Sequence, residues 1–151
     1  DPPPLRVPLE DYRNNLLAIV ADLESAGAGV ILVAAPSNLT QEARARILET
    51  RYLVRGDDAD AIHREYSGVV REVCETTDAT LLDASAAFAA ARAPKRLLMR
   101  DGIHLTDKGH RLMATLLTAH LSPDLVGGGT RPDVSAQAQR ALRFMQTDGV
   151  R

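Results

Sequence analysis

The chain has 151 residues, of which 45% are hydrophobic and 25% charged, a composition typical of one folded domain and not of a globally disordered chain. A net charge of −2 and an aromatic content of 3% argue against nucleic-acid binding, which needs phosphate-neutralising cations and usually stacking rings. No apolar run is long enough to span a bilayer and no signal peptide is visible, so we expect a cytoplasmic protein without a membrane span.

Hydrophobic periodicity and chain breakers divide the chain into helices and strands. In the first half we expect an extended lead-in over 1–8, a helix from 10 or 11 to about 26, a strand over 30–35 and helices over 41–55 and around 62–74. In the second half we expect a strand over 79–83, a short helix over 84–93, a turn over 101–104, a helix up to about 121 and an amphipathic helix over 133–145. Both strands are apolar at most positions, as in parallel sheets covered on both faces. The alternation of helices and strands along the chain predicts an α/β fold.

The domain organisation follows from the same pattern. Residues 1–121 form the body, 122–132 a glycine-rich linker, and 133–151 a C-terminal helix or tail. Two strands are fewer than the five or so of a typical sheet. We therefore expect either that a partner chain or a second copy completes the sheet, or that the chain is the C-terminal part of a larger domain.

A short run near residue 100 is the most informative motif. Asp101 precedes His104 by three residues, so on a tight turn its carboxylate can reach one imidazole nitrogen, fix the ring tautomer and stabilise the imidazolium. Thr106 is expected to cap the following helix and hold the turn. An ordinary Asp-Gly turn is one alternative. A metal site of His104, Asp107 and His110 is another, but no second cluster supplies further ligands, so no metal is expected.

Other polar or reactive side chains are expected to have structural roles. Cys74 lies on the apolar face of a predicted helix and reads as a small core residue. Asp83 ends a strand and reads as a turn or capping acid. His63, Ser67 and His120 are expected at solvated or surface positions of helices.

The run Asp101-Gly102-Ile103-His104-Leu105-Thr106, followed by Gly109, resembles the last conserved block of the SGNH (GDSL-type) esterases and lipases. Residues 7–16 and the strand ending in Pro36 are similar to the stretch after the third block of that family, with the isoamyl acetate-hydrolysing esterase type the closest branch. The resemblance covers most of residues 1–121. It implies a flavodoxin-like, three-layer α/β/α fold and serine ester hydrolysis without a cofactor.

The resemblance also implies roles for single residues. His104 matches the general base and Asp101 its orienting acid. The family's Gly-Asp-Ser-like block and its two oxyanion-hole donors are not in this sequence, so we expect the nucleophile from an upstream segment or second chain. Ser37 lacks a nucleophile-elbow sequence, and we expect it to line the acyl or alcohol pocket with Pro36 and Ile103.

The predicted function is hydrolysis of small or short-chain acyl esters by a Ser-His-Asp mechanism. Few aromatic residues and no apolar lid segment favour short esters over long-chain lipids. One alternative is an acyltransferase on the same scaffold, which differs only in the acceptor. Another is a non-catalytic α/β binding module or partner subunit that pairs its open sheet edge.

Overall fold

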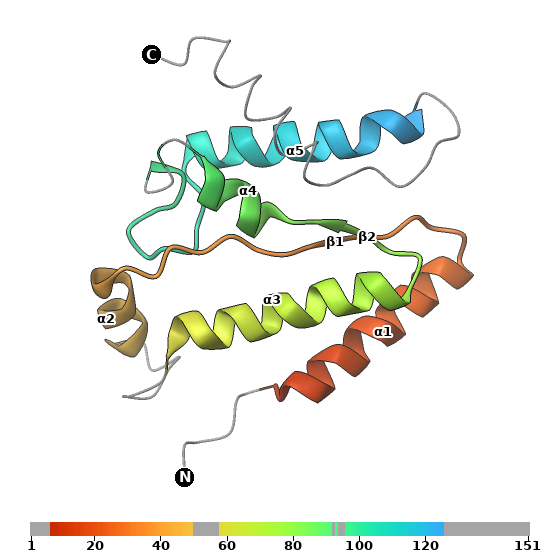
Figure 1. Cartoon of the computed structure of the whole chain (residues 1–151), viewed down its shortest axis with the longest axis horizontal. Helices are drawn as coiled ribbons and strands as arrows, with labels where there is room; N and C mark the ends of the chain where they lie inside the picture. The colour runs from red at the N-terminus through yellow and green to blue at the C-terminus, as the bar shows by residue number, and fades with distance from the viewer. Residues whose placement is uncertain (1–6, 50–57, 92, 94–95, 126–151) are drawn as a thin grey trace.

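A computed structural model describes residues 7–49, 58–91, 93 and 96–125. Two parallel strands lie between two layers of helices (Figure 1). The elements in chain order are α1 (Leu9–Ser25), β1 (Ile31–Val33), α2 (Gln41–Glu49), α3 (Ala59–Thr76), β2 (Thr80–Leu82), α4 (Ala84–Ala90) and α5 (Asp107–Leu125). The predicted α/β fold with a parallel sheet is therefore confirmed.

The sheet is covered on both faces by different helices. β1 and β2 pair in parallel with Leu32 opposite Leu81, and the chain crosses between them through α2 and α3. Because side chains alternate along a strand, Leu32 and Leu81 pack with α1 and α3, whereas Ile31 and Leu82 pack with α4 and α5. This two-sided burial explains why the strand sequences are apolar at most positions.

The layer formed by α1 and α3 is held by apolar, aromatic and ionic contacts. The rings of Tyr12 and Tyr66 lie with centroids 5.0 Å apart, and Arg13 pairs with Glu72 at 2.7 Å. Cys74 is buried in this layer, which confirms that it is a core residue. The layer brings α3, and with it His63, against the sheet.

The layer formed by α4 and α5 has its own apolar core. The buried residues of this core are Leu82, Ala84, Ala87, Phe88, Leu97, Leu98, Leu112 and Leu116. Asp83 starts α4 by accepting the Ala86 N–H at 2.9 Å, and it also binds Arg71 Nε of α3 at 2.9 Å. The prediction that Asp83 is a capping acid is confirmed, and the same carboxylate links the two sides of the sheet.

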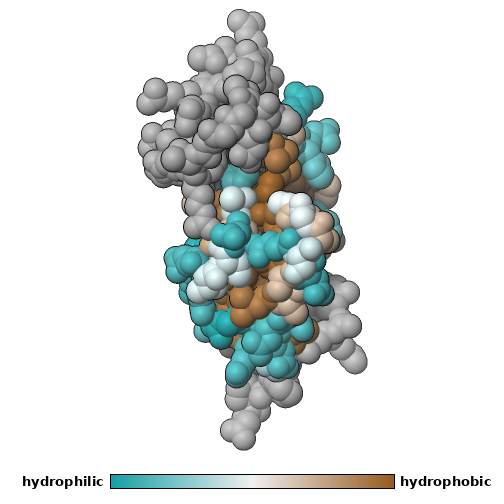
Figure 2. Space-filling view, turned by 90° about the vertical axis from the view of Figure 1, so that its right-hand side faces the viewer, coloured by the Kyte–Doolittle hydropathy of each residue, from teal (hydrophilic) through white to brown (hydrophobic). Residues whose placement is uncertain are grey.

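Apolar side chains reach the surface at the end of the molecule where strands β1 and β2 begin, opposite the end where both strands finish. Figure 2 shows a hydrophobic band between hydrophilic side chains on this face, which is the right-hand end of Figure 1. The exposed apolar residues of α1 and α5 include Ile19, Leu23 and Leu121.

Two helix boundaries differ from the expected ones for local backbone reasons. α1 begins one residue early because Pro8, with φ at −54°, already suits a helix start, and its carbonyl accepts the Tyr12 N–H at 2.9 Å. α4 ends three residues early because Ala91 adopts extended backbone, with φ at −66° and ψ at 147°.

The C-terminal part of the chain also differs from the expected division. α5 continues to Leu125, so residues 122–125 of the predicted linker are helical. The last part of the predicted 41–55 helix, the remaining linker and the predicted 133–145 helix lie outside the described residues.

Candidate active site

The predicted site residues come from two segments at the carboxyl end of the sheet. The loop after β1 contains Ser37, and the turn before α5 contains Asp101 and His104. The two segments touch, because the Asn38 N–H donates to the Gly102 carbonyl at 2.9 Å. This edge is where open α/β sheets commonly build ligand sites.

Asp101 and His104 form a hydrogen-bonded pair. Oδ2 of Asp101 lies 2.7 Å from Nδ1 of His104, and Oδ1 accepts the N–H groups of Ile103 and His104 at 3.0 Å each. The Ile103 N–H, followed by the side chain and N–H of His104, lowers the pKa of the Asp101 carboxyl to about 2. Asp101 is therefore a carboxylate at neutral pH, while the His104 side chain is 75% exposed.

Gly102 explains why the chain can turn so tightly between these two residues. Its φ of +73° lies in the left-handed region, which residues with a side chain rarely adopt. A Cβ at this position would also collide with the Asn38 carbonyl oxygen. Glycine is therefore required both by the turn and by its close approach to the loop after β1.

The turn is anchored on the side that leads into α5. Leu98 and Leu105 form an antiparallel bridge across its base. Oγ1 of Thr106 accepts the Gly109 N–H at 3.2 Å and donates to the Arg96 carbonyl at 2.8 Å. Thr106 therefore caps α5, as predicted, and a rigid helix start holds the histidine in place.

A cavity of about 450 Å³ lies beside the turn, within the range of small-molecule sites. Pro36, Ser37 and Ile103, the residues predicted to line a substrate pocket, all line it. Leu105 lines the cavity as well, so both sequence neighbours of His104, Ile103 and Leu105, lie in its wall. A molecule in the cavity is therefore adjacent to the Asp101–His104 pair.

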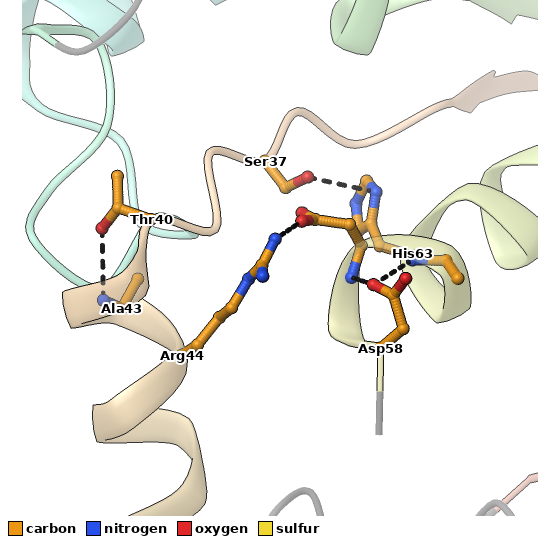
Figure 3. Close-up of polar contacts among 8 residues, drawn as sticks. Ser37, Thr40, Ala43, Arg44, Asp58 and His63 are labelled. Atoms are coloured by element: carbon orange, nitrogen blue, oxygen red, sulfur yellow. Dashed lines mark hydrogen bonds and ion pairs between the residues drawn. The ribbon is translucent and has the colours of Figure 1, made fainter. Parts of the chain in front are cut away.

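His63 of α3 is a cavity residue that the sequence interpretation missed. It is half-buried rather than solvated, and its Nδ1 lies 3.2 Å from Oγ of Ser37 (Figure 3). Burial, followed by the positive charge of Arg71, lowers the pKa of His63, so the ring is neutral at pH 7. One feature of the sequence indicates this partial burial: His63 lies between Ile62 and Tyr66, at the border of the apolar face of α3.

The comparison with known proteins decides the family. Residues 5–112 match the GDSL-like Lipase/Acylhydrolase family. The chain belongs to this family. It is also 27% identical over 108 residues to the GDSL esterase/lipase CPRD49 of Arabidopsis thaliana, a match that covers 72% of this chain and 42% of that protein. The chain thus spans less than half the length of this relative.

Family membership confirms the resemblance found in the sequence. Both the loop with Ser37 and the turn with His104 fall inside the matched residues, so the candidate site belongs to the GDSL-like domain. By its description, the family is one of lipases and acylhydrolases.

Two further expectations, about residues of α5 and α3, are wrong. His120 of α5 is only 2% exposed, and its Nε2 lies 3.0 Å from Oγ1 of Thr80 on β2. Ser67 of α3 is buried. Both helices bury a wider face than their aliphatic residues alone indicate, because each packs against the sheet and a neighbouring segment.

Over residues 7–49, 58–91 and 96–125, no group of three or more His, Cys, Asp or Glu side chains is arranged to hold a metal ion. Within the same ranges, no helix combines the length and the apolar character that a membrane crossing requires.

Proposed function

We propose that this chain supplies the histidine and its carboxylate partner to a Ser-His-Asp hydrolase of small or short-chain acyl esters. The contact of 2.7 Å between Asp101 and His104 is the observation that carries this proposal. An ionised Asp101 at Nδ1 orients the imidazole and leaves Nε2 for the proton of a nucleophile. Membership of a lipase and acylhydrolase family supports the same chemistry.

The proposed reaction is a double acyl transfer. Nε2 of His104 takes the proton of a serine hydroxyl while the serine oxygen bonds to the ester carbonyl carbon, and Asp101 stabilises the imidazolium. The imidazolium then protonates the leaving alcohol oxygen as its bond to the carbonyl carbon breaks. Water, deprotonated by His104, attacks the acyl-enzyme in the same way and releases the acid and the serine.

The nucleophilic serine and the oxyanion-hole donors are proposed to come from a segment or chain outside these 151 residues. The sequence contains no Gly-Asp-Ser-like block, and the described hydrogen bond of Ser37 goes to His63 rather than to His104. The same segment would add strands to β1, since the described sheet has only two. The lack of a nucleophile block and the small size of the sheet therefore both favour one additional segment or chain that supplies both.

Pro36, Ser37 and Ile103 are proposed to line the pocket for the acyl or alcohol group. The support is their position in the cavity beside the turn that holds His104. A cavity of about 450 Å³ is within the range of small-molecule sites, and the few aromatic residues and the lack of an apolar lid segment in the sequence favour short esters. Hydrolysis rates should therefore not rise steadily from acetate to palmitate esters.

The first test is denaturing intact-mass spectrometry of the active preparation with and without a serine-reactive fluorophosphonate. We expect one label on a second or longer polypeptide, and loss of labelling when His104→Ala is introduced. His110→Ala is the matched control, because His110 is an exposed histidine of α5. A single 16.3 kDa species that stays unlabelled would contradict the proposal, as would equal labelling of the His104→Ala protein.

A further inference from the structure

The cavity wall contains one polar pair that the proposed ester chemistry does not use. Three side chains in the described wall have hydrogen-bonding groups: Ser37, His63 and Tyr66. The Tyr66 hydroxyl donates to the Val7 carbonyl, so its proton is already engaged. Ser37 and His63 remain, 3.2 Å apart, one from the loop after β1 and one from α3 (Figure 3).

This pair keeps hydrogen-bonding capacity for a ligand. A serine hydroxyl has one donor and two acceptor sites, and a neutral imidazole has one donor and one acceptor. The single contact between Oγ and Nδ1 uses only part of that capacity. The rest of the described wall is apolar, so an alkyl ligand would leave the remaining capacity of this half-buried pair without a partner, whereas a ligand oxygen would satisfy it.

The charge state of the pair favours a neutral ligand group. Burial and Arg71 lower the pKa of His63, so the imidazole carries no positive charge at pH 7. Arg71 itself is paired with Asp83 at 2.9 Å. A carboxylate bound in this apolar cavity would have no cation in the described wall, and its burial would be unfavourable.

The pair is also held in position from both sides. The loop bearing Ser37 is tied to Gly102 through Asn38. Asp58 caps α3 by accepting the N–H groups of Asp60 and Ala61 at 3.1 Å each, just before His63. An ion pair between Arg44 and Asp60 joins α2 to the same end of α3 (Figure 3). Fixed polar groups lose little freedom on binding, which favours selectivity.

We propose that Ser37 and His63 select esters whose acyl or alcohol arm contains a neutral oxygen, such as a hydroxyl, ether or ketone. The arm would occupy the apolar cavity, its oxygen would bind the pair, and Ile103 and Leu105 would place the ester group near His104. This inference rests on the proposed function, which supplies the ester chemistry. It assigns the substrate class of that site.

The test compares esters that differ only by an oxygen for a methylene. Ethyl hexanoate is paired with ethyl 3-ethoxypropanoate for the acyl arm, and pentyl acetate with 2-ethoxyethyl acetate for the alcohol arm. For one of the pairs, we expect the ether-to-alkyl ratio of kcat/KM to be roughly three- to tenfold higher in the native active protein than in Ser37→Ala, the worth of one hydrogen bond.

Three more variants make the test specific. His63→Phe keeps a ring in the wall and should lower the same ratio, whereas Ser37→Thr keeps the hydroxyl and should preserve it. His110→Ala, an exposed histidine outside the cavity, should leave the ratio unchanged. Circular dichroism of each variant checks that it is folded.

The outcomes separate this inference from the proposed function. Ratios that are equal in the native protein, Ser37→Ala and His63→Phe would overturn the inference alone, as would a preference for monoethyl glutarate over the ether esters. If none of the esters is hydrolysed by a preparation that contains the complete protein, the proposed function fails and the inference fails with it.

Discussion

Asp101 uses its two carboxylate oxygens for different purposes. Oδ1 accepts two backbone N–H groups and shapes the turn, whereas Oδ2 lies against the His104 ring. The motif spacing alone predicted the contact with the ring. The backbone contacts were not predicted, because they depend on the positive φ of Gly102. Structural and chemical roles of this carboxylate can therefore be separated by substitution.

Asp101→Asn should keep the turn and lose the activity. The asparagine carbonyl can replace Oδ1, but its NH₂ group presents a donor to Nδ1 and favours the wrong ring tautomer. We expect kcat on a short-chain ester to fall by about 10³- to 10⁴-fold. The free energy of unfolding, measured by urea denaturation, should change much less than in Asp101→Ala, which lacks both oxygens. Near-native turnover by Asp101→Asn would contradict the role assigned to Asp101.

The depressed pKa of Asp101 predicts a specific dependence of stability on pH. An Asp carboxyl in an unfolded chain titrates near 3.9, whereas Asp101 in the folded chain has a pKa of about 2. Its contribution is therefore complete above the unfolded value and is lost as pH falls from about 4 through about 2. The difference in unfolding free energy between the native protein and Asp101→Asn should shrink across that window. A carboxyl ¹³C resonance of Asp101 that titrates near 4 would refute this.

Gly102 and Gly68 offer a matched pair of glycines. Gly102→Ala places a Cβ in left-handed backbone and against the Asn38 carbonyl, so we expect a loss of about 2 kcal/mol or more. Gly68 lies within α3, and a Cβ there meets no atom within 4 Å. Gly68→Ala should instead stabilise the protein by about 0.5–1 kcal/mol. Thermal and urea denaturation measure both, and equal effects would show that the turn is not constrained as described.

At the scale of elements, two helix caps of the same residue type differ in their surroundings. Asp58 is exposed and caps α3, whereas Asp83 caps α4, binds Arg71 and has a side chain only 15% exposed. Asp58→Ala should cost roughly 1 kcal/mol of stability. Asp83→Ala should cost about 2 kcal/mol, because it also removes a half-buried ionic contact. Chemical denaturation measures the difference, and a smaller loss for Asp83→Ala would argue against the bridging role.

The order and type of the elements could be read from the sequence, but some environments could not. Helix spacing and apolar runs located α1, α3 and both strands to within a few residues. His63 and His120 were misjudged because a polar side chain at the border of an apolar face has no periodic signal. The burial of such a side chain depends on the residue that a neighbouring segment packs against it, which is Ser37 for His63 and Thr80 for His120.

At the scale of the whole molecule, the sheet is the least complete feature. Two strands leave backbone groups of β1 without a second neighbouring strand among the described residues, and Val33 is 38% exposed. Sequence patterns predicted this shortage. The family resemblance implied that Ser37 and Ile103 line one pocket, but no sequence pattern indicated that His63 joins them, because its contact with Ser37 lies between positions far apart in the chain. A cytoplasmic location and association with a second copy stay predictions.

Hydrogen exchange can test whether another segment completes the sheet. In the 151-residue chain alone, peptides covering β1 should exchange faster than those of the packed half of α3. In a preparation that contains the proposed nucleophile-bearing segment, the β1 peptides should become protected, because a paired edge strand exchanges slowly. Unchanged exchange at β1 would show that the sheet is not extended from this edge.

The link between Asn38 and Gly102 has a practical consequence for altering substrate range. The loop that lines the cavity and the turn that holds His104 share a hydrogen bond of 2.9 Å and a contact too close for any side chain at Gly102. If the cavity holds the ester, as we propose, a mutation that shifts the loop to admit a larger substrate will also displace the histidine. Directed evolution at residues 36–38 should give variants that accept more esters but turn them over more slowly. Recovery of the turnover rate should require compensating changes near residues 99–103.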